Sequence, residues 1–270
     1  MMPFDPQRLA YGEHPDQYAE LTLPEDDEGD AVRSGNVPSG NVTSRKAGGV
    51  VVIIHGGYWR SRYTAELGRP AARDLAARGY ACWNLEYRRA GNGGGWPETF
   101  EDISAGIDAL EPAAQKHGLD LERVTVLGHS AGGHLAVWAA GRTEAAVPVT
   151  AVVSQAGVLN LAEALELNLS DGAVRNFLGS SPDADPHRYR SADPMQRLPL
   201  AVPVTALHGD SDKNVPLSQS AGFVQAAVDA GSPAELRMVP GDHFDLITPG
   251  TQAWAAVVEA VADASELRAT

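Results

Sequence analysis

The sequence has one cysteine, few basic residues and no long apolar run. The single cysteine, Cys82, excludes an intrachain disulfide, and its apolar surroundings predict a small buried side chain rather than a reactive thiol. The longest apolar run, at 50–54, is too short to span a bilayer. The N-terminal residues lack the basic start and apolar stretch of a signal peptide. These absences predict a cytoplasmic protein without a membrane segment.

Positive charge is scarce, because 21 Lys and Arg residues face 35 Asp and Glu residues, which gives a formal net charge of −14. Binding to nucleic acid depends on neutralising phosphates with Lys and Arg, and anionic lipid also attracts basic segments. The composition therefore argues against both kinds of partner. Its simplest consequence is solubility.

Strands and helices alternate along the 270 residues, which we interpret as a single α/β domain. The β-branched run at 50–54 is typical of a parallel strand buried on both faces. The alternation implies a mostly parallel sheet with helices on both sides. Further strands are expected at 81–87, 123–127, 149–154, 202–207 and 234–239, and helices at 65–78, 131–141, 217–230 and 251–267.

Four other segments complete the predicted organisation. Residues 18–23 alternate weakly, as an edge strand does, and the acidic, Gly/Ser-rich residues 25–48 are expected to form a mobile surface loop. Thr99–Asp102 resembles a capping box that opens a helix, whose buried face comprises Phe100, Ile103, Ile107 and Leu110. Residues 157–198 are too few and too polar to form a large lid domain.

The strongest chemical motif is Gly128-His129-Ser130-Ala131-Gly132, which fits Gly-x-Ser-x-Gly between a predicted strand and a predicted helix. In that context the serine sits on a sharp turn that exposes its hydroxyl above the sheet. Glycines flank it because side chains there would collide with neighbouring backbone. Ser130 is therefore the predicted nucleophile.

A serine nucleophile needs a histidine base that is oriented by a carboxylate, and in this arrangement the acid and then the histidine follow the serine. His243 lies in a Gly-containing loop after the last strand, whereas His187 is expected in an exposed loop and His208 to shape the acid loop. Asp212 and Asp210 both qualify as the acid. We prefer Asp212, because Asp210 is suited to bind loop backbone amides.

The oxyanion of an acyl-transfer intermediate needs backbone N–H donors. One is predicted to be Ala131, the residue after the nucleophile. The others are expected in His55-Gly56-Gly57-Tyr58-Trp59, where glycines let the backbone approach the substrate, and we assign Gly57 and Tyr58. His55 is expected to support this loop rather than to take part in catalysis.

These motifs together resemble the α/β-hydrolase superfamily, and most closely its hormone-sensitive-lipase-related esterases and the kynurenine formamidases (arylformamidases). The resemblance is carried by His-Gly-Gly-Tyr-Trp at 55–59, the elbow at 128–133, His-Gly-Asp-Ser-Asp at 208–212 and Asp-His-Phe at 242–244, and by Tyr-Gly-x-x-Pro at 11–15. It implies a cofactor-free hydrolase of small acyl esters (EC 3.1.1.-), with cleavage of N-formyl aryl amides such as N-formylkynurenine (EC 3.5.1.9) as the alternative. Neither metal nor cofactor is expected.

The substrate pocket is less well defined by the sequence. Trp59 and Trp96 are expected on loops at the carboxyl ends of strands, where they could stack an aryl group or simply pack loops onto the core. The Gly-rich segment at 91–97 departs from the loop common in the esterases, which leaves the substrate open. A non-catalytic binding protein on the same scaffold is a third hypothesis, and the oligomeric state is left open.

Overall fold

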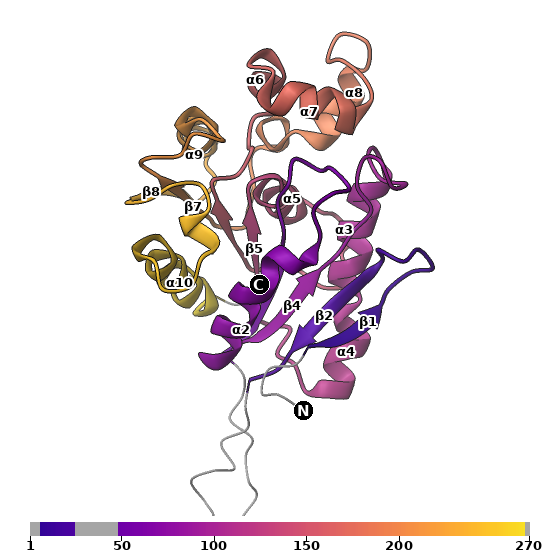
Figure 1. Ribbon diagram of the computed structural model, residues 1–270, viewed down its shortest axis with the longest axis vertical. Coiled ribbons are helices and arrows are strands. Elements are labelled where there is room, and N and C mark those ends of the chain that lie inside the picture. The colour runs from indigo at the N-terminus through magenta and orange to yellow at the C-terminus, as the bar shows by residue number, and fades with distance from the viewer. Residues whose placement is uncertain (1–5, 25–47, 268–270) are drawn as a thin grey trace, which may run out of the picture.

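The computed structural model describes residues 6–24 and 48–267 (Figure 1). The predicted mobile loop at 25–48 lies, except for its last residue, outside the described residues. Eight strands form one sheet in the order β1-β2-β4-β3-β5-β6-β7-β8. The strands are β1 (Gln7–Ala10), β2 (Tyr18–Thr22), β3 (Val50–Ile54), β4 (Ala81–Leu85), β5 (Val124–His129), β6 (Ala151–Gln155), β7 (Val204–Gly209) and β8 (Ala234–Val239).

The sheet is parallel from β4 to β8, as predicted, and antiparallel at its N-terminal end. The segment expected as an edge strand is β2, but β1 pairs with its outer side and takes the edge position. β1 is only four residues long and mostly exposed, so it lacks the hydrophobic alternation by which a strand is recognised.

Helices cover both faces of the sheet, as predicted, and each face has its own core. Along β3, Val50, Val52 and Ile54 point to one core while Val51 and Ile53 point to the other, which is the period of two expected of a strand. The first core holds α3 (Glu98–Asp108), α4 (Leu110–His117), α5 (Ala131–Ala140) and α9 (Leu217–Asp229), and the second holds α2 (Arg69–Ala77) and α10 (Gln252–Ser265).

The predicted capping box at the start of α3 is wrong. The helix begins at Glu98, one residue before Thr99, and no side chain caps it. The Thr99 hydroxyl donates instead to the carbonyl oxygen of Arg88 at 2.6 Å, and the Asp102 carboxylate binds the Arg88 guanidinium. Partners from the loop after β4, distant in sequence, thus replace the local contacts that the motif suggests. The predicted apolar face of this helix is buried, as expected.

The segment between β6 and β7 forms short helices at the carboxyl end of the sheet (Figure 1). It has no large lid among its described residues, in agreement with the prediction. The elements are α6 (Leu161–Glu166), α7 (Leu169–Leu178), α8 (Pro186–Ala192) and η2 (Pro194–Arg197); two further short helices, η1 (Ala65–Gly68) and η3 (Asp245–Ile247), precede α2 and α10.

The strand order reverses at β3, which pairs with β4 on one side and with β5 on the other. The chain that leaves β3 and the chain that leaves β5 therefore diverge at the carboxyl edge of the sheet. Ligands of open α/β sheets bind at such switch points. The residues after Ile54 and after His129 therefore lie where a ligand is expected to bind.

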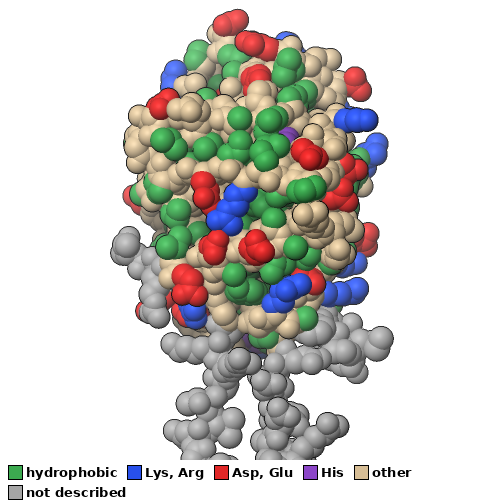
Figure 2. All heavy atoms as spheres, turned by 90° about the vertical axis from the view of Figure 1, so that its left-hand side faces the viewer, with side chains coloured by type: hydrophobic (Ala, Val, Ile, Leu, Met, Phe, Trp, Pro, Cys, Tyr) green, Lys and Arg blue, Asp and Glu red, His purple; other side chains and the backbone are tan. Residues whose placement is uncertain are grey.

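On the side formed by α9, β8 and α10, the described surface has no region that is purely acidic or purely basic. Figure 2 shows acidic, basic and hydrophobic side chains intermingled over this face. Within the described residues, no helix is both long and apolar enough to cross a bilayer.

Candidate active site

Ser130 occupies a strained turn between β5 and α5. Its backbone has φ 56° and ψ −119°, a conformation that non-glycine residues rarely adopt, and its N–H donates to the Gln155 carbonyl at 2.8 Å. A side chain at Gly128 would overlap the carbonyl of Gly132, and one at Gly132 would overlap that of Ile54. The glycines therefore let the elbow pack directly against β3.

His243 and Asp212 form a close pair in the loops after β8 and β7. The Nδ1–H of His243 donates to Asp212 Oδ2 at 2.6 Å. Both side chains are almost fully buried. Because the proton sits on Nδ1, the neutral ring presents an unprotonated Nε2, which is the form a general base requires.

The environment of Asp212 keeps its carboxylate ionised. Burial raises the pKa of Asp212, but hydrogen bonds from His243 and from the backbone N–H groups of Val215 and Asn214 outweigh it and lower the pKa below its usual value. The rival Asp210 is exposed and accepts the backbone N–H of Gly241 at 3.2 Å. The geometry thus pairs Asp212, and not Asp210, with the histidine.

His208 supports the acid loop, the role expected for it. Its Nε2–H donates to the Val215 carbonyl at 3.0 Å, and its Nδ1 accepts from the Ser220 hydroxyl at 2.8 Å. Burial lowers the pKa of His208, so the ring is neutral and both nitrogens are satisfied. His187 lies in α8, in the insertion between β6 and β7, and is exposed.

His129, the residue before the nucleophile, joins the elbow to the base loop. Its Nε2–H donates to the His243 carbonyl at 2.9 Å, and the two ring centroids are 4.4 Å apart. Burial, followed by the proximity of His243, lowers the pKa of His129 to about 3. A neutral His129 therefore holds the base loop against the elbow that carries Ser130.

The loop after β3, which contains two of the predicted oxyanion donors, touches the elbow at Gly56. Gly56 approaches so closely that an added Cβ would lie 2.8 Å from the His129 carbonyl and 3.0 Å from Ser130 Cβ. Gly57 has φ 114°, and a Cβ there would lie within 2.6 Å of Tyr63. Ala131 begins α5, so its N–H has no carbonyl partner within the helix. The loop after β3 and the start of α5 are therefore brought together at Ser130.

Tyr58 connects this loop to the acid loop. Its backbone has φ 50°, and its hydroxyl donates to the Asn214 carbonyl at 2.6 Å. Burial, with a smaller contribution from the nearby Asp212 charge, raises the pKa of Tyr58 to about 12. The phenol is therefore protonated at neutral pH and remains a donor.

Trp59 is fully buried, as the packing alternative expects, and its role as a pocket residue stays a prediction. Its ring stacks on Phe177 at a centroid distance of 4.6 Å, and its indole N–H donates to His134 Nδ1 at 3.2 Å. The large apolar ring is buried because α7 covers it, a contact that the local sequence does not reveal.

Trp96 is half-buried at the end of the Gly-rich loop, with its ring 5.1 Å from Phe100. The same loop contacts the insertion, since a Cβ on Gly95 would lie 3.1 Å from the Phe177 carbonyl. The loop therefore lies between α3 and α7. A role for Trp96 in substrate binding remains a prediction.

Ser130 and His243 are 2% and 3% exposed. Among the contacts of the described residues, no hydrogen bond joins their side chains. Catalytic hydrogen bonds are often long in unliganded enzymes and shorten when substrate binds.

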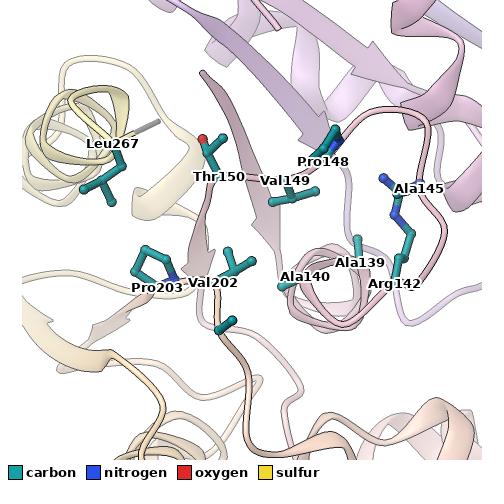
Figure 3. A pocket seen from close by; sticks show the side chains of 11 residues that line it. Ala139, Ala140, Arg142, Ala145, Pro148, Val149, Thr150, Val202, Pro203 and Leu267 are labelled. Carbon is teal, nitrogen blue, oxygen red and sulfur yellow. The ribbon is translucent and has the colours of Figure 1, made fainter. Parts of the chain in front are cut away.

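A pocket of about 490 Å³ lies at the opposite end of the sheet (Figure 3). Its walls include Ala140 at the end of α5, Thr150 before β6 and Pro203 before β7. These residues are at the amino ends of the strands, away from the elbow, and the lining is mostly apolar. This pocket therefore does not belong to the candidate active site.

Several residues that support the loop after β3 were not predicted from the sequence. Glu86 and Arg89 follow β4 and contact His55 of the loop after β3. Asp16, from the turn between β1 and β2, binds Arg89. The signal that could have found them is a charged run, Glu-Tyr-Arg-Arg at 86–89, directly after a buried strand at the switch point.

The BD-FAE family model matches residues 41–227, which is most of the chain. The chain belongs to the BD-FAE family. Solved structures share its fold: Esterase B from Lactobacillus Rhamnosis (TM-score 0.78, 21% identity, 98% of this chain and 87% of that one) and a bacterial heroin esterase (TM-score 0.74, 24% identity, 99% and 86%). The predicted α/β-hydrolase fold of this BD-FAE member is thereby confirmed.

Curated relatives extend the comparison. Esterase LipC of Mycobacterium tuberculosis is 28% identical over 260 residues, covering 89% of this chain and 60% of LipC. Esterase LipQ of the same organism is 30% identical over 235 residues, covering 79% and 54%. Isoprenylcysteine alpha-carbonyl methylesterase ICME of Arabidopsis thaliana is 26% identical over 258 residues, covering 88% and 56%. The BD-FAE member thus spans little more than half the length of these relatives.

Proposed function

We propose that this protein is a carboxylesterase that hydrolyses small esters through an acyl-enzyme on Ser130. The observation that carries the proposal is the position of the strained serine between two sets of groups. One set is the His243–Asp212 pair, held to the elbow by His129. The other is the glycine loop after β3, which touches the elbow at Gly56. Membership of the BD-FAE family and the esterase names of the relatives support the reaction class.

The first half-reaction forms the acyl-enzyme. His243 Nε2 takes the proton of the Ser130 hydroxyl as Oγ attacks the ester carbonyl, and the C=O π electrons move to the oxygen. Asp212 stabilises the resulting imidazolium through Nδ1. The oxyanion is bound by the N–H groups of Gly57, Tyr58 and Ala131. The intermediate collapses, the ester C–O bond breaks, and His243 protonates the leaving alcohol.

The second half-reaction repeats these steps with water. His243 removes a proton from a water molecule, whose oxygen attacks the acyl carbonyl. The second tetrahedral intermediate collapses with cleavage of the bond to Ser130 Oγ, and His243 returns the proton to that oxygen. A carboxylic acid leaves, and the free enzyme is restored. The residues of this chain supply every proton transfer.

The nearly closed site favours a small acyl group. Ser130 and His243 are almost inaccessible, and the insertion is fixed above the loop after β3 by the stacking of Trp59 on Phe177. Arg60 adds a hydrogen bond to the Ser170 carbonyl. We infer that a short acyl chain fits beside Ser130, whereas a long one would displace this packing.

Ser130→Ala is the decisive variant. It should abolish turnover of p-nitrophenyl acetate and labelling by a fluorophosphonate probe, with the thermal unfolding temperature retained. Ser154→Ala is the matched control, because Ser154 is a buried serine of the neighbouring β6 whose hydroxyl has no hydrogen-bond partner among the described residues. Its removal should leave activity unchanged, since a buried unpaired hydroxyl contributes nothing favourable. Retained turnover in Ser130→Ala would remove Ser130 from the mechanism.

The same assay examines the other two hypotheses. Comparing kcat/KM for N-formylkynurenine with that for short p-nitrophenyl esters measures formamidase against esterase activity. Cleavage of esters without cleavage of the amide would exclude the formamidase. A folded wild-type protein that does not react with the fluorophosphonate would support a non-catalytic binding protein.

A further inference from the structure

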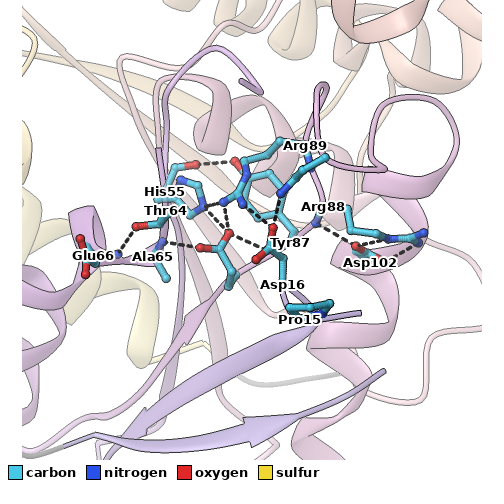
Figure 4. Close-up of polar contacts among 12 residues, drawn as sticks. Pro15, Asp16, His55, Thr64, Ala65, Glu66, Tyr87, Arg88, Arg89 and Asp102 are labelled. Atoms are coloured by element: carbon cyan, nitrogen blue, oxygen red, sulfur yellow. Dashed lines mark hydrogen bonds and ion pairs between the residues drawn. The ribbon is translucent and has the colours of Figure 1, made fainter. Parts of the chain in front are cut away.

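Four polar side chains form a network beside the glycine loop after β3 (Figure 4). Asp16, His55, Glu86 and Arg89 come from the β1–β2 turn, the end of β3 and the segment after β4. Their side chains are 24%, 0%, 1% and 2% exposed. Buried charges are expensive unless they are paired and hydrogen-bonded, so the partner of each group can be identified.

Glu86 is an ionised carboxylate. Its Oε1 accepts the backbone N–H of Tyr87 at 2.9 Å and an N–H of the Arg89 guanidinium. Its Oε2 accepts the backbone N–H of Ala65 at 2.8 Å. These three groups can only donate. The remaining neighbour, His55 Nε2, lies 3.0 Å from Oε1 and therefore faces an oxygen that already acts as an acceptor.

His55 donates through Nδ1. This nitrogen lies 2.8 Å from the carbonyl oxygen of Gly56, which can only accept. Nε2 lies 3.0 Å from Glu86 Oε1 and 3.5 Å from Arg89 Nη1, so an acceptor and a donor both face it. The ring also stacks on Tyr87 at a centroid distance of 4.6 Å, which fixes its plane. The bond from Nδ1 to the Gly56 carbonyl is therefore present whichever of the two groups Nε2 binds.

Arg89 extends the network to the N-terminal hairpin. It donates to Asp16 at 2.7 Å, and Asn92 donates to the same carboxylate oxygen. Arg89 thus pairs with both Glu86 and Asp16. The turn of the N-terminal hairpin thereby becomes part of the support for the site.

The bond from His55 to Gly56 has a geometric consequence. The carbonyl of Gly56 and the N–H of Gly57 belong to one planar trans peptide unit, so they point in opposite directions. Holding that carbonyl toward His55 therefore directs the Gly57 N–H away from the network. Gly56 itself touches the elbow, since a Cβ there would lie 3.0 Å from Ser130 Cβ.

We propose that His55, held by Glu86, is the positioning residue that aims the Gly57 N–H at the oxyanion. The inference rests on the proposed esterase function for its kinetic consequence. Glu86, Arg89 and Asp16 serve the same task, because their contacts hold the His55 ring in place.

Two substitutions of His55 distinguish the roles of its two ring nitrogens. The side-chain nitrogen of asparagine lies near the position of Nδ1 of histidine, and that of glutamine near Nε2. His55→Asn should keep the donor to the Gly56 carbonyl, whereas His55→Gln should lose it and keep the contact with Glu86. We expect His55→Gln to lower kcat by up to about 10²–10³-fold, the loss for one oxyanion donor, with little change in KM. Affinity for a trifluoromethyl ketone, which forms an oxyanion adduct, should fall by the same factor.

His55→Asn should retain most of the kcat that His55→Gln loses, and this rescue is the result that a merely structural role does not produce. Equal kcat in the two variants, whether high or low, would overturn the proposal. Nitrogen-15 NMR of wild-type histidine side chains tests the hydrogen bond without any variant. Nδ1 of His55 should carry a proton, and an unprotonated Nδ1 would overturn the proposal. A wild-type protein without esterase activity would refute the proposed function and leave this measurement valid.

Discussion

Substitution of the predicted acid by its amide, Asp212→Asn, should nearly eliminate catalysis while leaving the fold in place. Asp212 Oδ1 accepts two backbone N–H groups, from Asn214 at 2.7 Å and Val215 at 3.0 Å, and the amide oxygen of asparagine can keep both. The amide NH2 then replaces Oδ2 beside His243 Nδ1, 2.6 Å away. Two donors face each other, so the ring must move its proton to Nε2 and can no longer accept the proton of Ser130.

The expected loss follows from this change of tautomer. An amide in place of the triad carboxylate lowers kcat by about 10⁴-fold in a well-studied serine protease. At about 1.4 kcal/mol per factor of ten, that is about 5 kcal/mol of transition-state stabilisation. The loss of one charge-assisted hydrogen bond should lower the free energy of unfolding by about 1.5–3 kcal/mol. Stopped-flow turnover of p-nitrophenyl acetate and urea unfolding measure the two quantities.

The stability difference should depend on pH with a definite sign. The pKa of Asp212 is lowered in the folded protein, so its contribution is present at neutral pH and is lost as pH falls through the acid range. The wild type and Asp212→Asn should therefore converge in stability on acidification. Asp210→Asn is the control, since Asp210 is exposed and binds only loop groups. Loss of turnover in Asp210→Asn with turnover retained in Asp212→Asn would refute the assignment.

Two further predictions concern the elbow and the insertion. Gly132→Ala should destabilise the protein by about 1–3 kcal/mol and lower kcat, because the new methyl group overlaps the Ile54 carbonyl and displaces the adjoining loop. Thermal unfolding and ester turnover measure the two effects. Gly222→Ala is the control and should not destabilise the protein, because a methyl group there lies in open space on α9. Burial raises the pKa of Asp193 from 3.8 to about 6, so the folded state holds this proton more tightly and stability should fall as pH rises through that window. Urea unfolding across the window should show a flatter profile in Asp193→Asn, and identical profiles would contradict the assigned burial.

Much of the fold follows from the sequence because strand and helix periods are local properties. The run at 50–54 alternates between two cores and was recognisable as a strand without any partner. The Gly-x-Ser-x-Gly elbow was equally recognisable, because the close contacts at Gly128 and Gly132 arise wherever a strand turns sharply into a helix. The order of acid and base after the serine then limited the candidates to a few residues.

Contacts between distant segments decided the rest. The sequence could rank Asp212 above Asp210, but only the packing of the loop after β8 against that after β7 places one of them 2.6 Å from His243. The capping motif at Thr99 failed because its side chains contact Arg88 instead, and Trp59 packs on Phe177 of α7, which lies far along the chain. The network around His55 also depends on contacts between segments that are distant in sequence. Asp16 and Arg89 are separated by 73 residues, and their pairing exists only because the sheet brings the N-terminal hairpin beside β4.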